Sequence, residues 1–377
     1  MKAPAKGSET HRSLPACAVL LAGGRGTRFW PRSRMRTPKQ LLNIVGSDTM
    51  LRETMARLAP LVQPRNIWAV TNVEQAAAVR RELRGVPASH VVAEPVGRNT
   101  AAAIGLAAVH LAHEHGDALM AVLPSDAYIR DAAKYRGLVR AALDLARTEG
   151  NLVVLGIPPS RPETGYGYVE RAGISGRPRG VAAYAVRRFT EKPALPLARK
   201  YVASGKYLWN AGMFFWRVST FLDNLRRFLP ETHDALLELG RTIGTRRYAS
   251  ALRRIYPRLE NISVDYAVME PATRVSGQPR VSVIPAKVGW SDIGSWAAVH
   301  ELLAAKPGAN VSAGPSFALD ADGNYFWSPK KLVAAIGVRD LVLVETDDAL
   351  LLCSRERSQD VGKIVKWLED QKLSKLL

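Results

Sequence analysis

The sequence of 377 residues predicts an α/β fold followed by a smaller segment of short strands. Apolar runs of strand length alternate with stretches of helical apolar spacing over most of the chain, which is the order expected of α/β proteins. From about residue 311 the pattern changes to short strands separated by turn residues. A chain of this length can bury a substantial core, and we expect two unequal domains at residues 16–305 and 306–377.

The first predicted strand, residues 16–22, leads into a glycine-rich turn at residues 23–28 (GGRGTR). Its apolar run is typical of a strand buried on both faces, and the glycines allow a sharp turn that exposes backbone N–H groups. Arg25 and Arg28 add positive charge beside those donors, so the turn suits a polyphosphate. A tight turn without a ligand is the alternative that this stretch alone leaves open.

Two known glycine signatures do not match this turn. A P-loop ends in Gly-Lys-Ser or Gly-Lys-Thr, whereas Gly26 is followed by Thr27 and Arg28. The dinucleotide fingerprint of Rossmann dehydrogenases needs a third glycine, and Phe29 stands at that position. The turn therefore fails the P-loop pattern and disfavours a Rossmann dehydrogenase.

The next elements alternate in the same way. Helical spacing predicts helices at residues 51–61, 74–83 and 99–115, and apolar runs predict strands at residues 66–71, 91–93 and 119–123. Asn99 or Thr100 is the expected N-cap of the third helix. Asp126 follows the strand at 119–123, and open α/β sheets place ligands at the carboxyl ends of central strands. We therefore expect Asp126 to face a ligand.

The middle of the chain continues the pattern, with predicted strands at residues 152–157, 182–189 and 281–285 and a mostly helical stretch at 219–254. Glycine and aromatic residues alternate at 164–169 (TGYGYV), which suits a hairpin whose backbone approaches a ligand closely. Ser263 is the expected N-cap of a further helix, in which Asp265 is either a helix-start charge or a site contact. Asp292 lies in a tight turn between a strand and a helix.

The last part of the chain is predicted to consist of stacked short strands and a closing amphipathic helix. The strands are expected at residues 317–319, 325–327, 332–336, 341–345 and 349–352, and the helix at 359–371.

Composition limits the classes of partner and compartment. The formal charge of +19, from 53 basic and 34 acidic residues, comes mostly from scattered arginines without an aromatic-studded basic stripe, which favours an anionic small substrate over nucleic acid. No apolar run approaches the ~20 residues that span a bilayer. Residues 1–15 lack the apolar centre of a signal peptide and are expected to form a loose tail. Cys17 and Cys353 are far apart and outside any Cys-x-x-Cys spacing, so we expect no disulfide framework, no zinc site and a reducing cytoplasm.

Several motifs in a fixed order resemble the signature of sugar-nucleotide pyrophosphorylases, and specifically of the mannose-1-phosphate guanylyltransferases. The glycine turn is followed by Lys39, which comes directly after Pro38. The other matching segments are residues 94–100 (EPVGRNT), 164–169 (TGYGYV), 190–193 (TEKP), 209–214 (WNAGMF) and 289–296 (GWSDIGSW). The resemblance extends from Val19 to about Asp370, with one departure at Ala127, where the family commonly has histidine.

The resemblance implies four overlapping groups of site residues, which bind the nucleotide, the sugar phosphate and the metal or take part in catalysis. Glu94 is the candidate that selects guanine, because one carboxylate can accept hydrogen bonds from both N1–H and N2–H₂. The implied nucleotide-binding residues are Leu21, Ala22, Gly23, Gly24, Gly26, Thr27, Arg28, Lys39, Glu94, Arg98, Asn99, Thr100, Pro124, Ser125 and Asp126. The implied sugar-phosphate-binding residues are Gly165, Tyr166, Gly167, Glu191, Lys192 and Asn210. Asp126 and Asp292 would hold Mg²⁺, and the implied catalytic set is Arg28, Lys39, Asp126, Lys192 and Asp292.

The same resemblance implies a fold and a reaction. The fold is a GT-A or Rossmann-like mixed sheet flanked by helices, with a small β-helix-like C-terminal domain that supports a homodimer. The reaction is attack of mannose 1-phosphate on the α-phosphate of GTP, giving GDP-mannose and diphosphate. Bifunctional relatives continue into an isomerase domain and this sequence stops before it, so only the transferase activity is expected. The alternatives are a pyrophosphorylase for another base or sugar and a noncatalytic homologue that binds sugar nucleotide.

Overall fold

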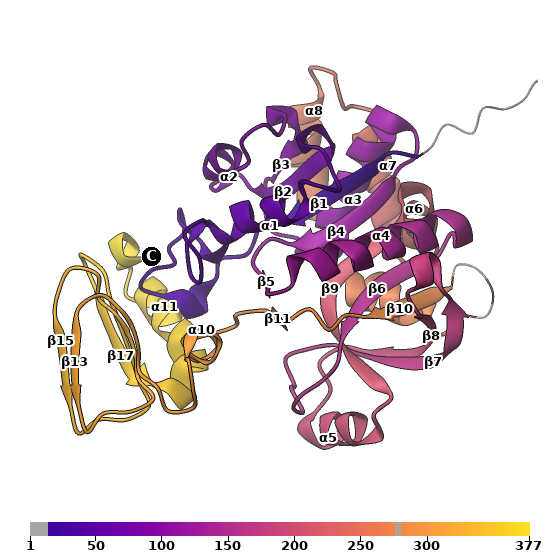
Figure 1. Ribbon diagram of the computed structural model, residues 1–377. Coiled ribbons are helices and arrows are strands. Elements are labelled where there is room, and N and C mark those ends of the chain that lie inside the picture. Colours follow the sequence, from indigo (N-terminus) through magenta and orange to yellow (C-terminus); the bar gives the residue numbers. More distant parts are fainter. Residues whose placement is uncertain (1–13, 276, 278–279) are drawn as a thin grey trace, which may run out of the picture.

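The computed structural model describes residues 14–275, 277 and 280–377 of the chain. It has an α/β body and, on one side of it, a smaller unit of short strands with helix α11, Val361–Asp370 (Figure 1). Residues 1–13 of the predicted N-terminal tail lie outside the described residues, and the first strand begins at Ala16.

A mixed sheet forms the centre of the body, as the resemblance implied. Among the described residues it has nine strands in the order β3-β2-β1-β4-β9-β6-β10-β8-β7. The strands β1 to β4 are mutually parallel, and β9 runs antiparallel between β4 and β6. The strand bounds are β1 Ala16–Leu21, β2 Ile67–Asn72, β3 Val91–Glu94, β4 Leu119–Pro124, β6 Leu152–Ile157, β7 Tyr168–Gly176, β8 Ala183–Thr190, β9 Tyr207–Arg217 and β10 Val281–Pro285.

Both faces of this sheet are buried, which explains the continuous apolar run of the first strand. Cys17 and Val19 of β1 belong to one hydrophobic cluster, and Ala18 and Leu20 belong to another, because successive side chains of a strand point to opposite faces. The helices α3 Asn99–His115, α6 Val218–Phe228, α7 Pro230–Gly240 and α8 Tyr248–Ile255 contribute to the first cluster. The helices α1 Met50–Leu58, α2 Ala76–Glu82, α4 Ala132–Glu149 and α5 Leu195–Ser204 contribute to the second.

The prediction that the side chain of Asn99 or Thr100 caps the N-terminus of α3 is wrong. Asn99 has a φ of +61°, and its Oδ1 accepts a hydrogen bond from the adjacent Thr100 N–H at 2.9 Å rather than from a residue further along the helix. The Thr100 hydroxyl oxygen accepts from the Val264 N–H at 2.9 Å. A tertiary contact therefore occupies the side chain that local sequence assigned to capping.

The C-terminal unit confirms the expected series of short stacked strands. Val311, Tyr325 and Val342 lie side by side on the parallel strands β12, β14 and β16, and β13 pairs in parallel with β15, which is a β-helix-like arrangement. The bounds are β12 Val311–Ala313, β13 Ser316–Leu319, β14 Tyr325–Trp327, β15 Val333–Ile336, β16 Leu341–Glu345 and β17 Leu350–Ser354.

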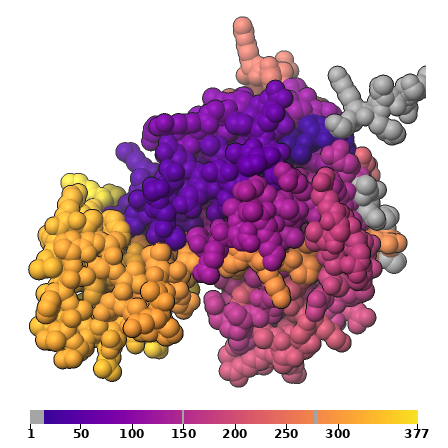
Figure 2. All heavy atoms as spheres, viewed as in Figure 1, coloured from indigo at the N-terminus to yellow at the C-terminus, as the bar shows by residue number. Residues whose placement is uncertain are grey.

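A third hydrophobic cluster joins this unit to the segment directly after the glycine turn. Phe29 packs edge-on against Trp296 of α10, Trp296–Leu303, with ring centroids 4.9 Å apart. The Trp30 indole N–H donates to the Leu376 carbonyl at 2.9 Å. Residues near the C-terminal end accordingly lie against N-terminal ones on the surface (Figure 2). The small unit thus supports the turn that we expect to bind phosphate.

Candidate functional site

The glycine turn is shaped to lie directly against Lys39. Gly26 has a φ of +61°, and a Cβ at this position would come within 2.4 Å of the Lys39 Cβ, so a larger residue would displace one of the two segments. The Gln40 side-chain amide donates to the Ala22 carbonyl at 2.8 Å and to the Gly24 carbonyl at 3.1 Å. Gln40 therefore fixes the turn, a role that the sequence pattern did not indicate.

Two very short strands bring the predicted metal-binding aspartates together. Strand β5, Tyr128–Ile129, begins two residues after Asp126, and β11, Trp290–Ser291, ends directly before Asp292. These strands pair in antiparallel fashion. A cavity of about 350 Å³ opens at this place, and Arg28, Lys39, Asp126 and Asp292 all line it. Four of the five residues implied to be catalytic thus share one cavity.

Lys39 lies between the two aspartate segments and is only 5% exposed. Its ammonium group donates to Asp126 Oδ2 at 2.9 Å and to the main-chain oxygen of Asp292 at 2.6 Å. A buried lysine needs such partners because an unpaired buried charge is costly. In this geometry Lys39 therefore organises the aspartate pair, beyond the triphosphate contact that the motif implied.

The donor set of the cavity fits a magnesium ion. Asp126 Oδ2 is bonded to Lys39, and Asp292 Oδ1 accepts a hydrogen bond from the Tyr166 hydroxyl at 2.6 Å, so each carboxylate has one further oxygen to offer. Within the described ranges no group of three or more acidic, histidine or cysteine side chains could hold a metal. A pair of carboxylates still suits Mg²⁺, which commonly takes one or two carboxylates and completes its shell with water and phosphate.

Glu94 lies at the end of β3 and is buried, with 7% exposed. Its Oε1 accepts a hydrogen bond from the hydroxyl of Tyr256, and its Oε2 would lie 3.2 Å from a Cβ placed on Gly23 of the glycine turn. Burial raises the pKa of Glu94 to about 7, and hydrogen bonds from Tyr256 and from the Arg98 backbone oppose that rise. Sequence reasoning missed Tyr256, because no local pattern links it to a residue so distant in the chain.

The rest of the 94–100 loop is anchored to the same region. The Arg98 guanidinium donates to the Pro257 carbonyl, next to Tyr256, and Thr100 is bonded to Val264. These contacts tie the loop to the protein, and nucleotide binding by Arg98, Asn99 and Thr100 stays a prediction. Leu21, Pro124 and Ser125 lie at the adjoining strand ends, where the Ser125 hydroxyl donates to the Leu21 carbonyl at 2.7 Å.

The residues implied to bind the sugar phosphate form a second cluster. Glu191 Oε1 pairs with Lys192 Nζ at 2.9 Å, and the Asn210 amide donates to Asp265 Oδ1 at 2.7 Å. Asp265 is therefore part of this cluster, and burial together with the nearby charge of Glu191 raises its pKa. Glu191 Oε2 is buried without a hydrogen-bond partner among the described residues. Such an oxygen is suited to accept a bond from a ligand hydroxyl.

The glycine and aromatic segment 164–169 differs in detail from its prediction. Residues 164–167 form a loop before β7, and the antiparallel hairpin is made by β7 and β8. A Cβ on Gly167 would lie 2.4 Å from Glu191 Oε2 and 3.2 Å from the Asn210 Cβ. Glycine is therefore required at position 167 because the backbone there approaches Glu191 and Asn210, two of the residues implied to bind the sugar phosphate.

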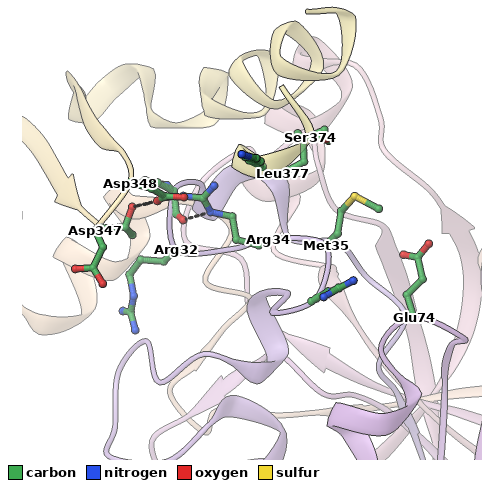
Figure 3. A pocket seen from close by; sticks show the side chains of 12 residues that line it. Arg32, Arg34, Met35, Glu74, Asp347, Asp348, Ser374 and Leu377 are labelled. Carbon is green, nitrogen blue, oxygen red and sulfur yellow. Dashed lines mark hydrogen bonds and ion pairs between the residues drawn. The ribbon is translucent and has the colours of Figure 1, made fainter. Parts of the chain in front are cut away.

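Another cavity, of about 840 Å³, lies between the loop at residues 31–36 and the turn at 346–348 (Figure 3). Arg34 pairs there with Asp348 at 2.7 Å and donates to the Pro31 carbonyl at 2.6 Å. The glycine turn and the two aspartates line the other cavity. The candidate site is therefore the smaller cavity.

Comparisons with known proteins identify the family of this chain. The family model described as "Nucleotidyl transferase" matches residues 17–307, and the model "MannoseP isomerase/GMP-like beta-helix domain" matches residues 314–368. The chain belongs to the nucleotidyl transferase family. Within that family it belongs with the mannose-1-phosphate guanylyltransferases, because relatives of that name match 93–94% of its length at 38–40% identity.

Three similarities illustrate this relationship. An Escherichia coli mannose-1-phosphate guanylyltransferase is 40% identical over 354 residues, covering 93% of this nucleotidyl transferase and 73% of the relative. The xanthan biosynthesis protein XanB of Xanthomonas campestris is 40% identical over 356 residues with the same coverage. A solved structure from Thermus thermophilus, titled a mannose-1-phosphate geranyltransferase, has 35% identity and a TM-score of 0.84 and covers 94% of this chain and 100% of its own.

Ala127 is the position at which this nucleotidyl transferase departs from the resemblance. Its side chain is buried and lines the cavity, and its carbonyl accepts a hydrogen bond from the Arg57 guanidinium at 2.9 Å. Arg57 in turn donates to the Thr54 hydroxyl at 2.7 Å. The backbone beside Asp126 is therefore held by α1.

Proposed function

We propose that this enzyme transfers GMP from GTP to α-D-mannose 1-phosphate, giving GDP-mannose and diphosphate. The observation that carries the proposal is one cavity lined by Arg28, Lys39, Asp126 and Asp292. Tyr166 joins this cavity to the cluster that contains Glu191 and Lys192, because its hydroxyl bonds Asp292 and its main-chain oxygen accepts from the Lys192 N–H. Its relatives bear the name of this activity. A different base or sugar is the alternative within the same chemistry.

The residues match what this reaction requires. Mannose 1-phosphate is already an anion near neutral pH, so the enzyme needs no serine, cysteine or histidine nucleophile and no strong base. It must bring two polyanions together and stabilise charge on the α-phosphate and the departing diphosphate. Lys192, whose side chain is 59% exposed, would position the incoming phosphate, and Arg28 and Lys39 would neutralise the diphosphate. A Mg²⁺ ion held by Asp126 and Asp292 would supply further charge stabilisation at the α-phosphate.

A substrate panel tests the proposal. The purified protein is incubated with each common nucleoside triphosphate and each of several sugar 1-phosphates, and diphosphate release is measured. We expect fastest release with GTP and mannose 1-phosphate. Faster release with another pair would replace the proposed substrates, and the absence of release with every pair would support a noncatalytic homologue.

The base preference depends on Glu94 in this proposal. Glu94→Gln should reduce the discrimination for GTP over ATP, because the amide presents a donor where guanine also has one. Each charge-assisted hydrogen bond lost is worth about 1.5 to 3 kcal/mol, or about 10- to 150-fold in specificity. The measurement is kcat/KM for both nucleotides. An unchanged GTP preference would mean that backbone groups, rather than Glu94, read the base.

The proposed assembly is a homodimer formed through the C-terminal strands. Phe317, Leu319 and Ile336 lie on one face of the β13–β15 pair and are 53%, 48% and 64% exposed. A contiguous exposed apolar face of this kind commonly marks an interaction site. The second face of the same unit exposes Leu350 and Leu352 of β17.

Charged substitutions on that face test the homodimer. Leu319→Glu together with Ile336→Glu should convert a dimeric species into a monomer in analytical ultracentrifugation, because like charges without partners would be buried at the interface. Activity per active site should be retained, since the cavity lies in the α/β body. A wild-type protein that sediments as a monomer, or a variant that stays dimeric, would rule out this interface.

We place the enzyme in the cytoplasm, on the ground that Cys17 and Cys353 are free thiols, as in reducing compartments. We propose neither nucleic acid nor a membrane among its partners. Separately, none of the helices in the described part of the chain combines the length and apolar character needed to cross a membrane.

A further inference from the structure

Tyr166 contacts three separate segments of the site. Its hydroxyl donates to Asp292 Oδ1 at 2.6 Å, and its main-chain oxygen accepts from the Lys192 N–H at 3.2 Å. The next carbonyl, that of Gly167, accepts from the Asn210 N–H at 2.8 Å. One dipeptide therefore joins an aspartate of the metal pair to the residues expected to hold the sugar phosphate.

The ring of Tyr166 is fixed by two perpendicular tryptophan contacts. Trp209 lies with its ring centroid 5.2 Å away at an interplanar angle of 77°, and Trp290 at 5.6 Å and 72°. Trp209 directly precedes Asn210, and Trp290 lies two residues before Asp292. Edge-to-face pairs of this kind restrict the ring beyond simple apolar burial. The hydroxyl is thus aimed at Asp292 by the same segments that form the site.

The Tyr166 hydroxyl is the donor in this contact, because the Asp292 carboxylate oxygen can only accept a hydrogen bond. A donor on Oδ1 fixes the rotation of the carboxylate about its side-chain bond and leaves Oδ2 for another partner. Hydrogen-bond partners of this type orient the carboxylates that bind metal ions.

We infer that Tyr166 is a positioning residue that sets the orientation of the Asp292 carboxylate for the divalent cation. The inference rests on the proposed function, in which Asp292 holds Mg²⁺. It goes beyond the sugar-phosphate contact that the motif implied for Tyr166, since the contact made by the side chain is to the aspartate.

The experiment compares Tyr166→Phe with Tyr168→Phe, a matched control from the same segment. The Tyr168 hydroxyl donates to the Glu163 carbonyl at 2.9 Å, so its variant also loses a hydrogen-bonded phenol hydroxyl, one that does not reach Asp292. Binding of Mn²⁺ alone to the full-length protein is followed by electron paramagnetic resonance. The Mg²⁺ activation constant and kcat are measured alongside, with thermal melts to monitor folding.

We expect Tyr166→Phe to bind Mn²⁺ about 10- to 100-fold more weakly, with its Mg²⁺ activation constant raised by a similar factor. Tyr168→Phe should bind Mn²⁺ as the unmodified protein does. Wild-type Mn²⁺ affinity in Tyr166→Phe, or an equal loss in both variants, would overturn the inference while leaving the proposed function in place. Wild-type affinity in Asp292→Asn would instead overturn the proposed metal role, and the inference with it.

Discussion

Asp126→Asn and Asp292→Asn are each expected to reduce turnover by at least about 100-fold while leaving the fold intact. The loss is charge stabilisation at the α-phosphate, which the amide cannot supply through a bound cation. Both substitutions preserve side-chain shape, and the Asp126 side chain is 42% exposed, so the packing should change little. The measurement is diphosphate release across a Mg²⁺ titration, with thermal melts as the folding control.

The double variant provides a sharper comparison. Removing both carboxylates should cost little more than removing one, because groups that act as a unit are not additive. The coupling expected here comes from one cation shared by the two carboxylates, because Lys39 bonds the Asp126 side chain but only the main-chain oxygen of Asp292. Near-normal turnover in either single variant at limiting Mg²⁺ would remove that residue from the metal site.

Lys39→Ala and Lys192→Ala are expected to fail differently. Lys39 is buried between the aspartate segments, so its loss should lower kcat/KM for GTP and also destabilise the fold. Lys192 is largely exposed and pairs with Glu191, so its loss should chiefly raise the KM for mannose 1-phosphate. Each effect is expected at about 10- to 150-fold, the worth of one strong charge-assisted contact.

Steady-state kinetics with each substrate varied in turn measures this difference. Lys200→Ala, on the exposed surface of α5 beside the sugar site's strands, is a suitable control for the general loss of a positive charge. Identical phenotypes in Lys39→Ala and Lys192→Ala, without bias toward either substrate, would refute the division of roles.

Much of the fold could be predicted because its signals are local. The apolar run of β1 indicated a strand covered on both faces, and Cys17 and Val19 do face one cluster while Ala18 and Leu20 face the other. The position of Asp126 just beyond the carboxyl end of β4 follows directly from the apolar run of that strand. The motif order then indicated the family, which the comparisons confirm.

What could not be predicted depends on pairing between distant segments. Strands β5 and β11 are only two residues long, too short for any periodic signal, yet they bring Asp292 beside Asp126. The contact of Tyr256 with Glu94 and that of Tyr166 with Asp292 likewise span more than a hundred residues. The wrong prediction of the N-cap of α3 has the same origin, because the Thr100 hydroxyl accepts a hydrogen bond from the distant Val264 N–H.

An isotope experiment tests the proposed reaction most directly. The protein is incubated with GTP, Mg²⁺ and mannose 1-phosphate that carries ¹⁸O in every phosphate oxygen not bound to the sugar. The ¹⁸O content of each product is then measured by mass spectrometry. We expect GDP-mannose that retains all of the label and diphosphate that contains none, because a sugar-phosphate oxygen attacks the α-phosphorus of GTP and the bond to the β-phosphate breaks. Labelled diphosphate, or release of GDP and phosphate in place of diphosphate, would contradict the direct transfer of GMP.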